Sequence, residues 1–169
     1  VLSATTTMVC APGARESVAP HAGALTGRIG LHLQLSGGEP CLPPEEVPSL
    51  VEATGSFPQK PKDPSEYVLD EVLQEWRAQV ERLRSWGIDP SHIDGHHHCF
   101  RPYDLFLCFC HLTQGLGIPA RALSWDMLAG YESLGIPAHR CITRWYNQGP
   151  EVQTLIDLLS GIAEVAKPD

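Results

Sequence analysis

Three consecutive histidines in the middle of the chain are the strongest chemical signal in this sequence. His96, His97 and His98 directly follow Asp94 and Gly95 and lie far from either end of the 169 residues. Neutral imidazole is the commonest metal ligand among side chains. In an extended or turn segment His96 and His98 share one side with Asp94, whose carboxylate could accept the second ring N–H of a metal-bound histidine. The run therefore predicts a metal site rather than a polar loop with accidental clustering of histidines.

Another histidine lies on an alternating segment earlier in the chain. In residues 28–35 the aliphatic side chains point one way, and His32 points the other way with Gly30 and Gln34. Taken alone, His32 is expected on the polar, solvent-facing side of a half-buried strand. The His run changes this expectation, because histidines at the ends of two neighbouring strands would supply two ligands to one metal.

The elements that must position these histidines follow from the apolar periodicity and from the Pro and Gly breaks. We expect strands at 2–10, 28–35, 91–94, 120–124 and 140–145, at most a short helix within 11–27, and a loop with six Pro at 39–63. We expect helices from Asp63-Pro64 to Gly87, from Pro102 to 115–117, and from Pro150 through Ile162. This alternation argues for a parallel sheet covered by helices, with functional residues at the carboxyl ends of the strands.

Two histidines leave the predicted metal site incomplete. A hydrolytic metal usually has three protein ligands and one open position for water, and an Asp or Glu is the expected third ligand. No convincing acid stands at another strand end. Glu39, Glu45 and Glu46 lie in the long loop and are interpreted as solvated surface acids, and Asp126 is only a weak candidate.

The six cysteines form neither a convincing metal motif nor a disulfide framework. Cys10, Cys41 and Cys141 are scattered along the chain. Cys99, Cys108, Cys110 and His111 are a rival ligand set, but residues two apart on a helix point to nearly opposite sides. We expect Cys108 and Cys110 in the apolar core, and all six as free thiols in a reducing, cytoplasmic compartment.

Composition narrows the classes of partner. The chain carries 20 acidic and 12 basic residues, a formal charge of −8, and no Lys/Arg cluster, which argues against nucleic acid or an anionic membrane as partner. No apolar run reaches the roughly 20 residues that span a bilayer, and the N-terminus lacks the pattern of a signal peptide. A neutral substrate such as a sugar is compatible with this charge.

Four stretches resemble the YdjC-like carbohydrate deacetylases, a family that includes the diacetylchitooligosaccharide deacetylases. They are residues 30–33 with the following GGEPCLPPEEVPSLVEATGSFP, the EWRAQ segment at 75–79, residues 89–98 with the His run, and, more weakly, 117–121 with 135–137. The resemblance implies the α/β class, as an incomplete distorted (β/α) barrel of the glycoside hydrolase/deacetylase type with mostly parallel strands. It assigns the two histidine ligands to His32 and His96.

The resemblance also implies an activity, a cofactor and a substrate. Family members use a divalent metal, here Mg or Zn, to remove acetyl groups from N-acetylated sugars, so the expected substrate is an N-acetylated oligosaccharide. Asp94, His98 and Arg121 are expected to support the metal ligands or to bind substrate. Arg121 could equally form only a surface ion pair.

Three departures from the family pattern limit what this chain is expected to do. The 169 residues lack the Asp-Asp-Phe-Gly type motif that supplies the carboxylate ligand and base, lack the C-terminal His-Pro-Gly motif, and carry Phe100 where the family often has another His. We therefore expect residues 1–169 to be a single deacetylase domain truncated at both ends, with no catalytic acid or base identified and no activity alone. The unpaired strand edges of an open barrel would favour a homodimer.

Two alternatives stay open at this point. One is a non-catalytic relative that binds sugar or metal. The other, weaker alternative is a different metal hydrolase on a similar barrel, which would need a phosphate-binding basic cluster or a Gly-rich loop. The Pro-rich loop at 39–63 is predicted to cover the site.

Overall fold

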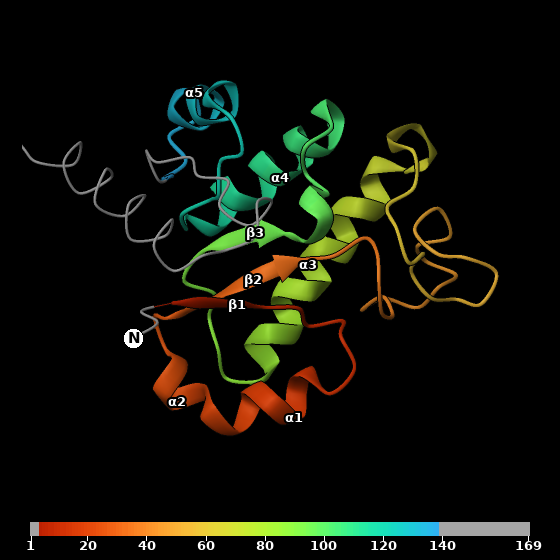
Figure 1. Cartoon of the computed structure of the whole chain (residues 1–169), viewed down its shortest axis with the longest axis horizontal. Coiled ribbons are helices and arrows are strands. Elements are labelled where there is room, and N and C mark those ends of the chain that lie inside the picture. The colour runs from red at the N-terminus through yellow and green to blue at the C-terminus, as the bar shows by residue number, and fades with distance from the viewer. Residues whose placement is uncertain (1–3, 139–169) are drawn as a thin grey trace, which may run out of the picture.

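Three parallel strands form the centre of the molecule (Figure 1). The structure is a computed structural model that describes residues 4–138. The strands, in spatial order, are β1 (Thr5–Thr7), β2 (Ile29–Leu33) and β3 (Ile93–Gly95). Parallel bridges from Ile93 to Ala120 and from Ala120 to Ala138 continue the pairing beyond β3. Within residues 4–138 the sheet does not close, which confirms the expected α/β architecture with an incomplete barrel.

Helices connect and cover the strands. The chain passes from β1 to β2 through α1 (Ala14–Val18), the 3-10 turn η1 (Ala19–His21) and α2 (Ala22–Leu25), which lie below the sheet in Figure 1. The longer helices are α3 (Leu69–Ser85), α4 (Tyr103–Leu116) and α5 (Trp125–Ser133). Helices α3 and α4 pack against each other, and α3 also contacts β2. No helix in the described part of the chain combines the length and apolar character needed to cross a membrane.

The predicted apolar stripe of α3 faces the core. Val72, Trp76, Val80 and Leu83 are buried on this face. The Trp76 ring meets Phe109 of α4 edge to face, with ring centroids 6.3 Å apart. This aromatic contact fixes α3 against α4, and burial of such large side chains contributes on the order of 2–3 kcal/mol each.

Helix α3 begins later than the sequence predicts. Asp63 caps only a 3-10 turn, η2 (Pro64–Glu66), in which its carboxylate accepts the Ser65 N–H. The next residues are extended because the preceding loop binds them. The Tyr67 hydroxyl accepts the Lys62 N–H, and the Val68 N–H donates to the Ser49 hydroxyl.

The polar side of β2 and its extension is buried except at His32, which is half-buried, and the expectation of a solvent-facing polar side is wrong for Gln34. The strand packs against α3. Leu31, Leu33, Gln34 and Ser36 are fully buried. The Gln34 backbone exchanges two hydrogen bonds of 2.9 Å with the Gln79 side chain of α3, so this polar residue is satisfied inside the core.

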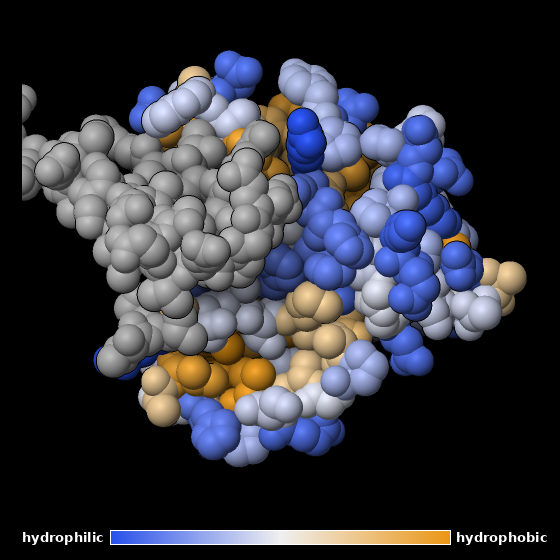
Figure 2. Space-filling model, viewed as in Figure 1, coloured by the Kyte–Doolittle hydropathy of each residue, from blue (hydrophilic) through white to orange (hydrophobic). Residues whose placement is uncertain are grey.

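The loop at residues 39–63 contains no helix or strand, as predicted, and is held by specific contacts. The Lys62 ammonium donates to the carbonyls of Ser49 and Val51, and the Ser49 N–H donates to the Glu71 carboxylate of α3. The loop lies at the right in Figure 1, and Figure 2 shows mostly hydrophilic side chains on that side of the molecule. A hydrophobic area lies near α2 in the same view.

The region after α4 departs most from the sequence prediction. The predicted strand at 120–124 is reduced to a bridge at Ala120, and α5, which the sequence analysis missed, follows at Trp125. The Ser124 hydroxyl caps α5 by accepting the Met127 N–H at 3.2 Å. Among the described residues of the strand predicted at 2–10, only β1 is a strand. The elements predicted at 140–145 and 150–162 lie outside the described residues.

Candidate active site

His32 and Asp94 face each other across two neighbouring strands. The parallel register pairs His32 of β2 with Asp94 of β3. The Nδ1 atom of His32 lies 2.5 Å from Oδ1 of Asp94, and the two side chains are 21% and 11% exposed. A carboxylate that accepts the Nδ1 proton orients the ring and leaves Nε2 as the nitrogen that can bind a metal.

His96 follows directly at the carboxyl end of β3. Its ring centroid lies 5.6 Å from that of His32, in an edge-to-face arrangement. Burial lowers the pKa of His96, and the neighbouring His97 and His32 lower it further. The ring is therefore neutral near pH 7, which is the form that binds a metal.

The backbone of the His run is a tight 3-10 turn, η3 (His96–His98), with two unusual conformations. His97 and His98 have φ angles of 51° and 55°, in the left-handed region that few residues other than glycine adopt. The His97 ring lies against that of His96, tilted by 36° with centroids 3.8 Å apart, and its Nδ1 lies 2.9 Å from the Ser36 hydroxyl. Such strain is typical of functional sites, where the surrounding structure holds it in place.

Arg121 and His98 complete the surroundings of Asp94. The Arg121 guanidinium lies 3.5 Å from Oδ2 of Asp94, so the carboxylate lies between His32 and Arg121. Burial lowers the pKa of His98, and the positive charges of Arg121 and Arg101 lower it further. All five residues predicted for the site thus lie around the carboxyl ends of β2 and β3.

Gly95 is required by close packing behind the His run. A Cβ atom at this position would lie 2.7 Å from Cδ1 of Phe100 and 2.8 Å from Sγ of Cys99. Phe100 is fully buried and stacks on Phe109 with centroids 4.3 Å apart. Phe100 therefore belongs to the core that supports the His run.

The described residues do not supply a third ligand to His32 and His96. Among them, no Cys, Asp, Glu or further His completes a group of three ligand atoms around these two histidines. Glu39, Glu45 and Glu46 are exposed, and Asp126 is exposed on α5. The described part of the chain contains one such group elsewhere, formed by Cys10, Cys41 and Glu75. The sequence analysis missed it because its members are 31 to 65 residues apart.

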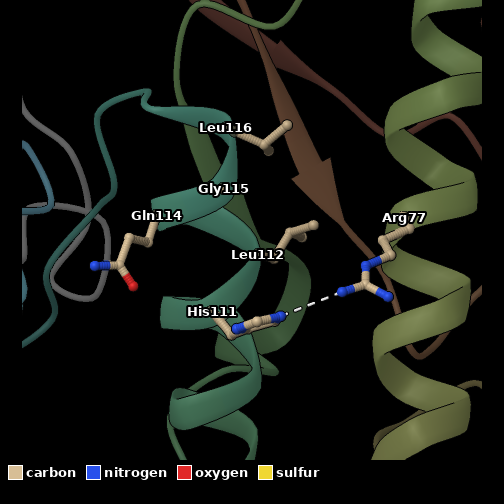
Figure 3. A pocket seen from close by; sticks show the side chains of 6 residues that line it. All are labelled: Arg77, His111, Leu112, Gln114, Gly115 and Leu116. Carbon is tan, nitrogen blue, oxygen red and sulfur yellow. Dashed lines mark hydrogen bonds between the residues drawn. The ribbon is translucent and has the colours of Figure 1, made fainter.

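Two hollows border the helices around the site. One, of about 180 Å³, is lined by His97 and His98 together with Lys62, Tyr67 and Pro102, so the end of the long loop lies next to the His run. The other lies between α3 and α4 and contains none of the predicted site residues (Figure 3).

The rival cysteine–histidine set does not assemble among the described residues. His111 is turned towards α3, where its Nε2 lies 3.2 Å from the Arg77 guanidinium (Figure 3). Cys99 and Cys110 are buried and Cys108 is half-buried, in agreement with the interpretation of these cysteines as packing residues. The five cysteines within residues 4–138 are free thiols.

Comparison with known proteins gives the family. The family model described as YdjC-like protein matches residues 1–166. A carbohydrate deacetylase of Clostridium beijerinckii is 32% identical over 78% of this chain and 53% of its own length. A chitooligosaccharide deacetylase of Serratia marcescens is 33% identical over 72% of this chain and 48% of its own length.

A solved structure agrees with these relatives. The crystal structure of a putative cellobiose-phosphate cleavage protein from Enterococcus faecalis V583 superposes with a TM-score of 0.81 and 29% identity, covering 95% of this chain and 64% of that one. The chain spans about half the length of the first relatives named above. The match of one family model to nearly every residue shows that this chain belongs to the YdjC-like protein family.

Proposed function

We propose that this chain is part of a metal-dependent carbohydrate deacetylase that removes acetyl groups from N-acetylated sugars of the chitooligosaccharide type. The observation that carries the proposal is the partly buried His32–Asp94 contact beside His96, at the carboxyl ends of two parallel strands. The names of the relatives, carbohydrate deacetylase and chitooligosaccharide deacetylase, support the same activity.

The side chains present fit half of a divalent metal site. His32 and His96 would hold the ion, and two imidazoles suit Zn²⁺ and also Mg²⁺ when a carboxylate completes the set. The third ligand would be the Asp of the family's Asp-Asp-Phe-Gly type motif, which these 169 residues do not contain. When bound, the metal supplies Lewis-acid polarisation of the acetamide carbonyl and a lowered pKa for its water.

The residues of this chain prepare the site for that ion. Asp94 would keep the proton of His32 on Nδ1, which would leave the lone pair of Nε2 available to a metal ion. Arg121 lies against the other oxygen of Asp94 and fixes the orientation of the carboxylate. His98 lines the hollow with Tyr67 and Pro102, where a sugar ring could lie over apolar side-chain surface.

The remaining expectations follow from this assignment. Residues 1–169 form a single deacetylase domain that is inactive by itself, because the catalytic base must come from the missing motif. The free thiols favour a cytoplasmic location, and the open sheet edge favours a homodimer.

A non-catalytic role in binding metal or sugar is the second candidate function. Within residues 4–138, His32 and His96 have no third ligand, which is what a non-catalytic metal- or sugar-binding relative would also show. The two proposals make different predictions for a protein that also contains the family's two terminal motifs. The deacetylase would release acetate from its substrate, and the non-catalytic relative would not.

The test compares metal binding and acetate release. We expect calorimetry to show that His96→Ala loses binding of one metal ion, whereas His111→Ala, at the exposed contact between α4 and Arg77 of α3, retains it. A protein that also contains the family's two terminal motifs should release acetate from N-acetylated chitooligosaccharides, and its His96→Ala form should not. Metal binding without acetate release would favour the non-catalytic function, and equal acetate release by both proteins would refute the assigned metal site.

A further inference from the structure

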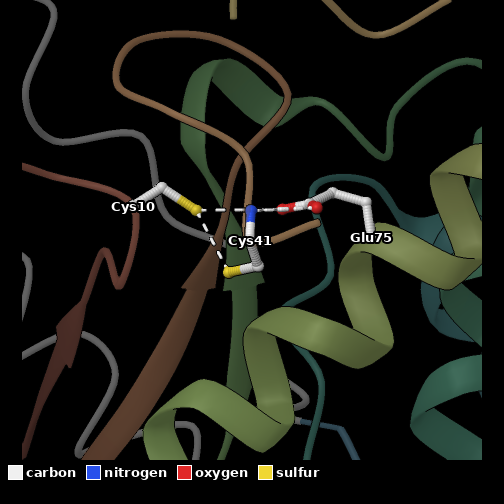
Figure 4. A group of neighbouring side chains, drawn as sticks. All are labelled: Cys10, Cys41 and Glu75. Atoms are coloured by element: carbon white, nitrogen blue, oxygen red, sulfur yellow. Dashed lines mark hydrogen bonds between the residues drawn. The ribbon is translucent and has the colours of Figure 1, made fainter. Parts of the chain in front are cut away.

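Three side chains that the proposed deacetylase chemistry does not use converge at a second, buried point. Cys10 follows β1, Cys41 lies in the loop after β2, and Glu75 lies on α3 (Figure 4). The two sulfur atoms are 3.7 Å apart, and Sγ of Cys10 is 3.9 Å from Oε1 of Glu75. One ligand atom from each residue lies within 4.8 Å of the other two.

We propose that Cys10, Cys41 and Glu75 bind a soft divalent cation of the Zn²⁺ type, through two thiolates and one carboxylate oxygen. Water would fill the fourth position. This site is separate from the histidines, and the proposal does not depend on deacetylase activity.

The two separations that involve the Cys10 sulfur fit a tetrahedral zinc ion. Zinc–sulfur bonds of about 2.3 Å at a tetrahedral angle put two sulfurs about 3.8 Å apart, and a zinc–oxygen bond of about 2.1 Å puts sulfur and oxygen about 3.6 Å apart. The Cys10–Cys41 and Cys10–Glu75 distances are 3.7 and 3.9 Å. Both therefore lie within a few tenths of an ångström of the required geometry before any ion is bound.

The hydrogen bonds around Glu75 hold its carboxylate in place for this role. Glu75 is fully buried, and it accepts the N–H groups of Cys41 and Leu42 and the side-chain amide of Gln79, at 2.8–3.0 Å. The Cys10 thiol donates to Oε1 of the same carboxylate. The thiol proton thus lies between two of the ligand atoms, where a cation would replace it.

The charge balance favours a cation at this point. Among the described residues, no Lys or Arg forms an ion pair with Glu75, and burial raises its pKa. The Arg82 guanidinium is near, but it donates to the carbonyl of Cys41. Binding of Zn²⁺ with release of two thiol protons would give three ligand charges of −1 against +2, and Arg82 offsets the remaining negative charge.

The donor set also predicts selectivity and an effect on stability. Thiolates select Zn²⁺ and related soft ions over Mg²⁺. The ion would join the segment after β1, the long loop and α3, so its binding should stabilise the folded chain.

The test uses the reduced, metal-free chain with both His32→Ala and His96→Ala, so that the histidine half-site does not contribute. We expect one equivalent of Cd²⁺, a spectroscopic substitute for Zn²⁺, to produce thiolate-to-metal charge-transfer absorption in the ultraviolet. Zn²⁺ should displace it and Mg²⁺ should not. The absorption should be lost in Cys10→Ser and Cys41→Ser and retained in the matched control Cys108→Ser on α4.

A second measurement keeps the proposal testable if a serine variant does not fold. In the chain with all its cysteines, Zn²⁺ should slow the modification of Cys10 and Cys41 by a thiol reagent, mapped by peptide mass, and leave Cys108 unaffected. Equal modification of Cys10 and Cys41 with and without Zn²⁺, or charge-transfer absorption that survives Cys10→Ser in a folded variant, would overturn the proposal.

Discussion

His32 on β2 and Asp94 on β3 are register partners, and the 2.5 Å contact between Nδ1 and Oδ1 is a direct product of that register. In a parallel sheet, a shift of one residue would move one of the two side chains to the opposite face. The pairing of the strands therefore also fixes the tautomer and orientation of the imidazole.

Asp94→Asn should weaken metal binding at His32 by about 10–100-fold, because an amide accepts the ring proton less strongly than a carboxylate does. Isothermal calorimetry with Zn²⁺, on a chain that carries Cys10→Ser and Cys41→Ser so that the second proposed site does not contribute, would measure this change. Asp126→Asn removes an exposed carboxylate on α5 and is the matched control, for which we expect no change. Unchanged affinity in Asp94→Asn would show that the contact does not act on the metal ligand.

Gly95→Ala should destabilise the fold by about 1–3 kcal/mol, because the new methyl group would overlap the buried Phe100 ring and the Cys99 sulfur. Urea unfolding would measure the loss. Gly115→Ala, in open space within α4, is the control and should stabilise the chain by about 0.5–1 kcal/mol. Equal stability of Gly95→Ala and the unmodified chain would contradict the packing described behind the His run.

Gln79→Glu should cost about 3 kcal/mol or more at neutral pH. The new carboxylate could no longer donate to the Gln34 carbonyl or to Glu75, and it would place a second negative charge beside Glu75. Acidification should recover part of the loss, because a protonated carboxyl can donate again. The same change at the exposed Gln74 of the same helix should alter the unfolding free energy by less than about 0.5 kcal/mol. A similar loss at both positions would argue against the buried Gln34–Gln79 pairing.

Cys110→Ala should reduce the loss of stability in alkaline solution. Burial raises the pKa of Cys110 from 9.0 to about 11, so the folded chain holds this proton more tightly than the unfolded chain does. Its contribution to stability is complete below pH 9.0 and is lost as the pH rises through about 11. Unfolding free energies measured across this range should fall less steeply in Cys110→Ala. Leu112→Ala, which shortens a buried side chain of the same helix without a titratable group, should lower stability while keeping the original slope.

Much of the local structure could be predicted from the sequence, because local patterns encode it. The apolar stripe of α3 repeats with the period of a helix, and Pro102 and Gly117 bound α4. The alternation of residues 28–35 predicts β2, and the His run after a short strand indicates where metal chemistry would lie. Helix α5 escaped prediction because its nine residues have a weak apolar period and its main signal is the Ser124 cap.

By itself, the sequence determined the family and the parallel α/β architecture, and it predicted His32 and His96 as two ligands of one metal. Only the tertiary structure decided the contacts between distant segments. It buried Gln34 against Gln79 and brought Cys10, Cys41 and Glu75 to one point. The physical reason is that periodicity and capping act over a few neighbouring residues, whereas these contacts depend on how α3 and the long loop pack on the sheet.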